Sequence, residues 1–148
     1  MVSYQNKTFT KDYLMIRTLT ICSLLMLAAT TASASGFKIS FDWSGLKRCT
    51  SGSPNTVSNP QFIIKGLPSG TEYVRFKLRD RNVPGYNHGG GTVKVNSNGK
   101  VAKNSFKYKS PCPPSGSHTY EWTATATDKK GWGGKKLGIA KASRRYPE

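Results

Sequence analysis

Acidic residues are scarce in this sequence. Only 7 Asp and Glu stand against 23 Lys and Arg, which gives a formal net charge of +16 at pH 7. An excess of cations favours anionic partners such as lipid headgroups, acidic glycans, nucleic acids or acidic protein surfaces. The cations are scattered along the chain, and no specific nucleic-acid motif accompanies them. A second interpretation therefore stays open, in which the charge is a general property of an exported protein and marks no particular partner.

Residue types that carry catalysis are also few. The sequence holds 2 His, His88 and His118, and it lacks the Gly-x-Ser-x-Gly elbow of many hydrolases. The glycine run at 89–91 is not followed by the Lys-Ser/Thr pair that a phosphate-cradling loop requires. Two histidines without a nearby carboxylate cluster supply a metal site poorly. We therefore expect a binding protein without a cofactor, and not an enzyme.

No apolar run in the sequence is long enough to span a bilayer. A span takes roughly 20 residues, and the apolar run at 21–29 is about half that length. It follows a basic stretch and precedes Ala-Ser-Ala at 32–34, which is the small-residue pattern that a signal peptidase needs. We predict that residues 1–34 are a signal peptide and that residues 35–148 form a single domain, which is periplasmic or secreted.

Cysteine is rare as well. Of the 3 Cys, Cys22 falls inside the predicted signal peptide, which leaves Cys49 and Cys112. An exported chain meets oxidising conditions, where an even number of cysteines favours a disulfide. A bridge would close a loop of about 64 residues and stabilise the fold by about 4 kcal/mol, because it removes chain entropy from the unfolded state. Two buried free thiols are the alternative.

Alternation of apolar and polar residues with a period of two dominates the remaining sequence, and no segment has convincing helical periodicity. The alternation predicts half-buried strands at 37–43, 61–65, 72–79 and 118–127. Residues 92–95 and 100–102 are expected to form a hairpin around the Asn-Ser-Asn-Gly turn at 96–99. Residues 135–145 fit either a last strand or a short helix. Many short strands separated by turns are typical of a β-sandwich, so a mostly β fold is predicted.

A group of polar residues lies where the longest predicted strand begins. Strand alternation puts His118, Tyr120 and Trp122 on one face, and Trp122 is expected to belong to the core. The preceding residues 111–116, Pro-Cys-Pro-Pro-Ser-Gly, make a stiff wall because proline fixes φ and lacks an amide donor. An imidazole and a phenol beside such a wall can donate hydrogen bonds to an anion or a small polar ligand. A role as ordinary strand residues is the alternative.

A resemblance to a known family covers much of the chain after residue 49. Residues 108–128, YKSPCPPSGSHTYEWTATATD, resemble the signature of the phosphatidylethanolamine-binding protein family in its bacterial, Raf kinase inhibitor-like branch. That family has a proline-rich turn, then a glycine, a His-Arg-Tyr triplet and a long strand; Thr119 stands here in place of the arginine. Further similarities precede this stretch in the same order: Cys49 with Gly52, Ser58-Asn59-Pro60, Gly66-Leu67-Pro68, Gly70-Thr71, the segment LRDRNVP at 78–84, and His88.

The resemblance implies a phosphatidylethanolamine-binding-like β-sandwich with Greek-key connections and one small pocket. Six residues would line this pocket: Asp80, His88, Pro113, Pro114, His118 and Tyr120. In such families the pocket accepts a phosphate-like anion or a phospholipid headgroup, no catalytic turnover is attributed to it, and a protein partner can be regulated. Asp80 would hold an imidazole in one tautomer or accept from a ligand ammonium. The imidazoles and Tyr120 would donate to phosphate oxygens.

Each of these residues also has an ordinary structural explanation. Asp80 can simply cap a turn, and His88 in a glycine-rich loop can be solvated. The alternative function for the whole chain places binding on the basic strand face, which we define as Arg75, Lys77 and Arg79. This face would hold an anionic polymer or a membrane surface. Binding there would weaken steeply with added salt, whereas binding in a discrete pocket would respond less.

Overall fold

The computed structural model describes Met1, residues 36–131 and residues 133–148. The predicted signal peptide and its cleavage site lie, apart from Met1, outside these residues. The described residues form β-strands and contain no α-helix, and so no helix among them is long and apolar enough to cross a membrane. The mostly β fold predicted from the alternation is confirmed.

The described part of the chain contains nine strands. They are β1 (Lys38–Phe41), β2 (Thr56–Ser58), β3 (Phe62–Lys65), β4 (Tyr73–Asp80), β5 (Gly90–Lys94), β6 (Gly99–Val101), β7 (Lys107–Lys109), β8 (His118–Thr127) and β9 (Lys136–Tyr146). The four strands predicted from alternation correspond to β1, β3, β4 and β8. The segment 135–145, which fitted a strand or a helix, is a strand.

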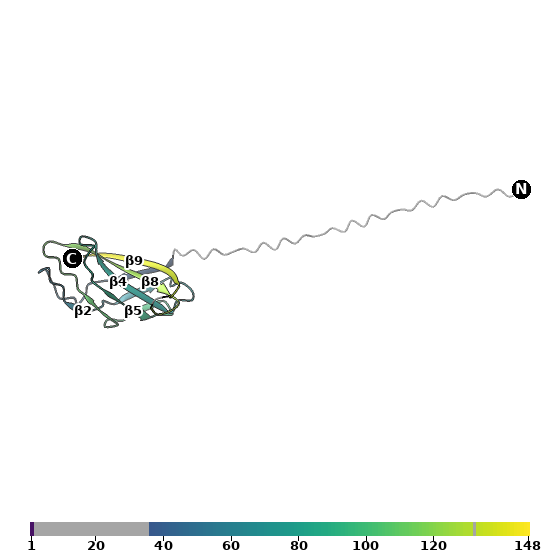
Figure 1. Cartoon of the computed structure of the whole chain (residues 1–148), viewed down its shortest axis with the longest axis horizontal. Coiled ribbons are helices and arrows are strands. Elements are labelled where there is room, and N and C mark those ends of the chain that lie inside the picture. Colours follow the sequence, from purple (N-terminus) through teal and green to yellow (C-terminus); the bar gives the residue numbers. More distant parts are fainter. Residues whose placement is uncertain (2–35, 132) are drawn as a thin grey trace. The chain divides into compact units, whose positions relative to one another are not determined.

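The strands of the described residues form antiparallel sheets (Figure 1). The largest sheet has the order β5-β4-β8-β9, a second has the order β1-β3-β6, and β2 pairs with β7 in a third. In the largest sheet, β4 pairs with β8 along its whole length, from Tyr73 opposite Thr127 to Asp80 opposite Tyr120. This central pairing fixes which residues of β4 and β8 lie opposite each other.

Apolar residues from the two larger sheets meet in one core. Buried residues of β4 alternate with exposed basic ones, as a period of two predicts. Phe76 of β4 stacks on Phe62 of β3 with the ring centroids 4.4 Å apart. Trp122 of β8 is fully buried and meets Phe62 edge-on at 5.2 Å. Such aromatic pairs contribute about 0.5–1.5 kcal/mol each beyond their area burial. The two sheets therefore pack face to face, and Trp122 is a core residue as predicted.

The hairpin predicted between residues 92–95 and 100–102 is wrong. β5 pairs with β4, whereas β6 pairs with β3 in the other sheet. Residues 96–99 therefore connect two sheets instead of two paired strands. The reason is the burial of Val101, which lies opposite Phe62 and belongs to the core. A turn motif carries no information on which sheet the following strand joins.

The glycine run at 89–91 has a packing explanation. A Cβ atom at Gly91 would overlap Cγ of Phe106, whose ring stacks on that of Phe76 with centroids 5.7 Å apart. At Gly90, where φ is +154°, a Cβ atom would overlap the carbonyl oxygen of Phe76. The missing side chains thus let Phe106 and β4 pack closely against the start of β5, directly after His88.

Replacing Gly91 by alanine tests this packing. We expect Gly91→Ala to lower the free energy of unfolding by about 1–3 kcal/mol, because the ring of Phe106 must leave its place in the core. Gly85→Ala is the matched control, since a Cβ atom there meets nothing within 4 Å. The measurement is urea unfolding followed by tryptophan fluorescence. Equal stabilities of the two variants would contradict the close approach.

Candidate functional site

All six residues predicted to form a pocket line one cavity of the structure. The cavity has a volume of about 230 Å³. It is lined by Asp80, His88, Pro113, Pro114, His118 and Tyr120, together with Gly52, Pro54, Val83, Tyr86 and Cys112. It lies where β4 ends and β8 begins. This volume suits a small ligand, because pockets for drug-sized molecules span about 300–1,000 Å³.

The pairing of β4 with β8 brings an acid and a histidine together. Asp80 is the last residue of β4 and lies opposite Tyr120, while His118 precedes Tyr120 by two positions and shares its face of β8. Diagonal neighbours across a sheet are within reach of long side chains. Nδ1 of His118 donates to Oδ2 of Asp80 at 2.7 Å. The two side chains are largely shielded from solvent, with exposed fractions of 15% and 5%.

Asp80 keeps its charge in spite of this burial. Its Oδ1 accepts from the backbone amides of Asn82 at 2.8 Å and Val83 at 3.2 Å. Burial by itself would raise the pKa of Asp80, but the hydrogen bonds from His118 and the two amides outweigh it, and the pKa lies below its ordinary value. Asp80 therefore caps a turn and also orients His118. Because Nδ1 of His118 is engaged, Nε2 is the ring nitrogen left for a ligand.

His88 is held by the backbone of β7. Its Nδ1 lies 2.9 Å from the carbonyl oxygen of Lys109, which can only accept, so Nδ1 carries the hydrogen. The amide of Lys109 donates in return to the carbonyl of His88 at 2.8 Å. Only 2% of His88 is exposed, so the alternative of a solvated side chain is wrong. Burial lowers the pKa of His88 below its ordinary 6.5, which favours a neutral ring with a lone pair on Nε2.

Tyr120 stands between the two imidazoles. Its ring centroid lies 5.4 Å from that of His88 and 6.3 Å from that of His118. Burial, with the nearby Asp80 carboxylate as the next cause, raises the pKa of Tyr120 above its ordinary value. The phenol therefore stays protonated at neutral pH and remains a hydrogen-bond donor. Two residues far apart in the sequence, His88 and His118, thus share one phenol as a neighbour.

The proline wall of the pocket is fastened by a disulfide. Cys49 and Cys112 are bonded across a sequence separation of 63, which confirms the predicted bridge. It ties the loop after Cys49 to the segment that carries Pro113, a fully buried residue. In this loop Gly52 has a positive φ of 74°, and a Cβ atom added there would lie 3.2 Å from Cβ of Pro114. The loop therefore packs closely on the wall and contributes to the lining of the pocket.

Several lining residues have no signal in the sequence. Tyr86, which is 41% exposed, places its ring 4.6 Å from that of His88. Val83 reaches the cavity through the turn that Asp80 caps. Such loop residues lack periodicity, so alternation cannot place them. The lining residues Gly52 and Pro54, by contrast, follow Cys49. They could have been assigned to the wall from the sequence once the disulfide with Cys112 was assumed.

The polar groups of the pocket suit a small polar ligand. The pocket supplies two imidazole Nε2 atoms, the Tyr120 hydroxyl and the charged Asp80. In the described part of the chain, no group of three or more His, Cys, Asp and Glu side chains is arranged to hold a metal ion. This set can hold a small anion or a ligand that carries both an acceptor and a cation.

Comparisons with known proteins identify no relative. No protein-family model, no curated protein and no solved structure matches the chain. The resemblance that the sequence shows to a family therefore rests on the residues themselves.

The burial of His88 predicts a dependence of stability on pH. The unfolded chain takes up a proton at the ordinary pKa of 6.5, whereas the folded state resists it. The contribution of His88 to the free energy of unfolding should therefore be complete above this pKa. The free energy of unfolding should fall as the pH decreases toward the lower pKa of the folded state. Urea unfolding at about pH 7.5 and about pH 5.5 measures this loss. A His88→Gln variant should lose less on acidification than the unaltered protein, and an equal loss in the two would be the contrary result.

Proposed function

We propose that this chain is an exported domain of the phosphatidylethanolamine-binding type, with a Greek-key sandwich and a small anion pocket, and that it binds its ligand without turning it over. The observation that carries the proposal is the convergence of His88, His118 and Tyr120 on one small cavity beside a proline wall. These residues come from β8 and from the loop before β5. The family resemblance implies this set of residues, and the cavity they line is of the right size for a phosphate group.

The donors of the pocket suit a phosphate oxygen. The Tyr120 hydroxyl donates directly, and each imidazole gains an Nε2–H when it is protonated. An anion in the pocket favours the charged form of neighbouring imidazoles. Hydrogen bonds that involve an ionised group are worth about 1.5–3 kcal/mol each. Asp80 lies in the same pocket and supplies an acceptor for an ammonium, so a zwitterionic headgroup such as phosphoethanolamine satisfies both ends of the site.

Two further observations fit this role. The disulfide between Cys49 and Cys112 favours an oxidising compartment, as expected after removal of a signal peptide. Val83 and Tyr86 form an exposed rim of the pocket, with exposed fractions of 46% and 41%. Apolar groups at the mouth of a ligand site are available to a protein partner, whose binding the ligand would then regulate.

Removing a donor from the pocket tests the proposal. We expect Tyr120→Phe and His118→Ala each to lower the affinity for inorganic phosphate or phosphoethanolamine by about tenfold or more, because each loses a hydrogen bond to a charged group. The measurement is isothermal titration calorimetry with both probes. Tighter binding of phosphoethanolamine than of phosphate identifies the headgroup as the better ligand.

The matched control is Tyr73→Phe, which removes the hydroxyl of a half-buried residue at the other end of β4 and should leave both affinities unchanged. Cooperative thermal unfolding of each variant shows that the fold survives. An unchanged phosphate affinity in a folded His118→Ala protein would speak against the pocket.

A second candidate function lies on the outer face of the large sheet. The basic strand face lines a groove of about 730 Å³. The acid in this groove, Glu121, is already paired with Arg81 at 2.8 Å and with Lys141 at 3.2 Å. Within the described part of the chain, no ion pair engages the cations of the basic strand face. They are therefore available to an anionic polymer or membrane surface.

Salt and charge removal test this second function. A triple variant with Arg75, Lys77 and Arg79 changed to glutamine should elute from heparin resin at clearly lower salt, because exposed charges attract through a screened potential. The control variant changes Lys38, Lys65 and Lys100 to glutamine, which removes the same charge. These three lysines are exposed on the sheet formed by β1, β3 and β6. Equal elution of the two variants would show that only net charge matters.

A further inference from the structure

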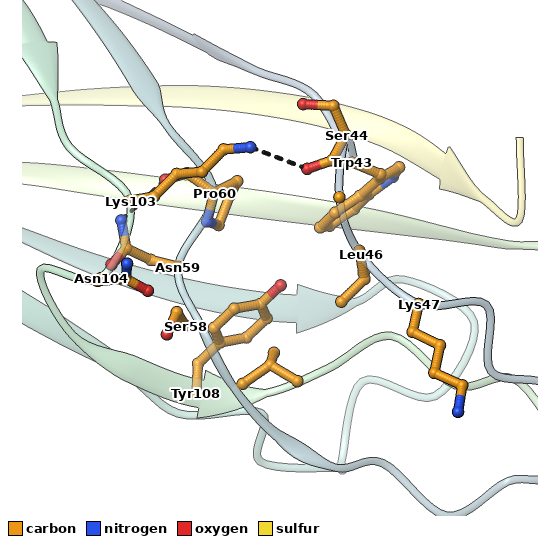
Figure 2. A pocket seen from close by; sticks show the side chains of 12 residues that line it. Trp43, Ser44, Leu46, Lys47, Ser58, Asn59, Pro60, Lys103, Asn104 and Tyr108 are labelled. Carbon is orange, nitrogen blue, oxygen red and sulfur yellow. Dashed lines mark hydrogen bonds between the residues drawn. The ribbon is translucent and has the colours of Figure 1, made fainter.

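A second cavity lies between residues 43–47, which follow β1, and residues of β2 and β7. Figure 2 shows the side chains that line it. Its volume is about 310 Å³, at the lower end of the usual range for small-molecule sites. Its apolar walls come from Trp43, Leu46, Val57 and the ring of Tyr108. Trp43 is fixed in this wall because its Nε1 donates to the carbonyl of Arg145 at 2.8 Å. The cavity shares no lining residue with the phosphate pocket.

The hydroxyl of Tyr108 is the distinctive polar group of this cavity. Tyr108 is only 4% exposed, and its ring packs edge-on to Trp122 with centroids 5.0 Å apart. Figure 2 shows the hydroxyl pointing into the space beside Trp43 and Leu46. No hydrogen bond engages it within the described part of the chain. Burial raises the pKa of Tyr108 above its ordinary value, so the group is a neutral donor. Among the described residues, Trp122 Nε1 alone is a buried side-chain polar atom without a partner. The Tyr108 hydroxyl is therefore open to the cavity, where a ligand acceptor can reach it.

The rim of the cavity is cationic. Lys103 extends toward the segment after β1, where its Nζ donates to the carbonyl of Ser44 at 3.2 Å (Figure 2). Lys47 also lines the cavity, and none of the lining residues is acidic. One phenol donor and a lysine at the rim, above apolar walls, match an anion with an apolar body. A phosphate would lose more hydration here than one phenol and a lysine can replace.

We propose that this cavity is a second binding site, which takes a small amphiphilic carboxylate. The apolar chain or ring of the ligand lies against Trp43, Leu46 and Val57. The carboxylate accepts from the Tyr108 hydroxyl, and Lys103 at the rim compensates its charge. This site acts independently of the function proposed for the phosphate pocket.

Octanoate is a suitable probe for this site. Titrated into the whole protein, it should shift the indole N–H resonance of Trp43 in a saturable way, because this indole forms a wall of the cavity. Octanol should bind at least about fivefold more weakly, since it lacks the charge that Lys103 compensates. Tyr108→Phe should lower the octanoate affinity by about tenfold, because it removes a hydrogen bond to a charged group. The Tyr108→Phe variant keeps the aromatic ring that packs on Trp122.

Two controls separate this site from the rest of the molecule. Tyr73→Phe, which removes a hydroxyl outside the cavity, should leave the octanoate affinity unchanged, and excess inorganic phosphate should not compete. The proposal is overturned if Trp43 shows no saturable shift, if Tyr108→Phe binds octanoate as well as the unaltered protein does, or if phosphate displaces octanoate. None of these outcomes bears on whether His118→Ala loses phosphate binding.

Discussion

The hydrogen bond between Asp80 and His118 holds the candidate pocket in its arrangement. A carboxylate with so little exposure is costly unless every oxygen has a partner, and removing one partner of a buried pair costs several kcal/mol. Asp80 meets this requirement with His118 on one oxygen and two backbone amides on the other. The end of β4, the turn after it and the start of β8 are thereby fixed together. His88 and Tyr120 can then face the same small space.

Much of the fold follows from the period of two in the sequence. β4 alternates cleanly, because one face packs on the core while the other meets solvent. β8 has no exposed residue, and Glu121 on its outer face is buried as well. The predicted bounds of both strands agree closely with the structure. The connection between β5 and β6 did not follow from the sequence pattern. Its turn residues are compatible with a hairpin, and the choice of sheet depends on Val101, whose burial opposite Phe62 is a contact distant in sequence. Local chemistry cannot encode that choice.

The candidate site was predictable to a similar degree. The side chains that line the pocket from β4 and β8 follow from strand alternation once the register is known, but the position of His88 required the resemblance to a family, since no local pattern points it inward. The glycines after it allow Phe106 and β4 to pack closely against the start of β5. The cavity around Tyr108 had no counterpart in the sequence, because its walls come from three separate segments. Such a cavity arises from the packing of segments that are distant in sequence, so no local sequence pattern reveals it.

The proline wall has a consequence for how the pocket would select a ligand. It is anchored at one end by the disulfide at Cys112 and at the other by the first pair of β8, where His118 lies opposite Tyr146. A wall that is already ordered loses little conformational entropy when a ligand arrives, so a small ligand is received by a preorganised surface. The same rigidity prevents the wall from yielding to a bulkier molecule. If the pocket has the proposed function, discrimination by size would then come from the covalent framework and would not depend on which ligand the donors hold.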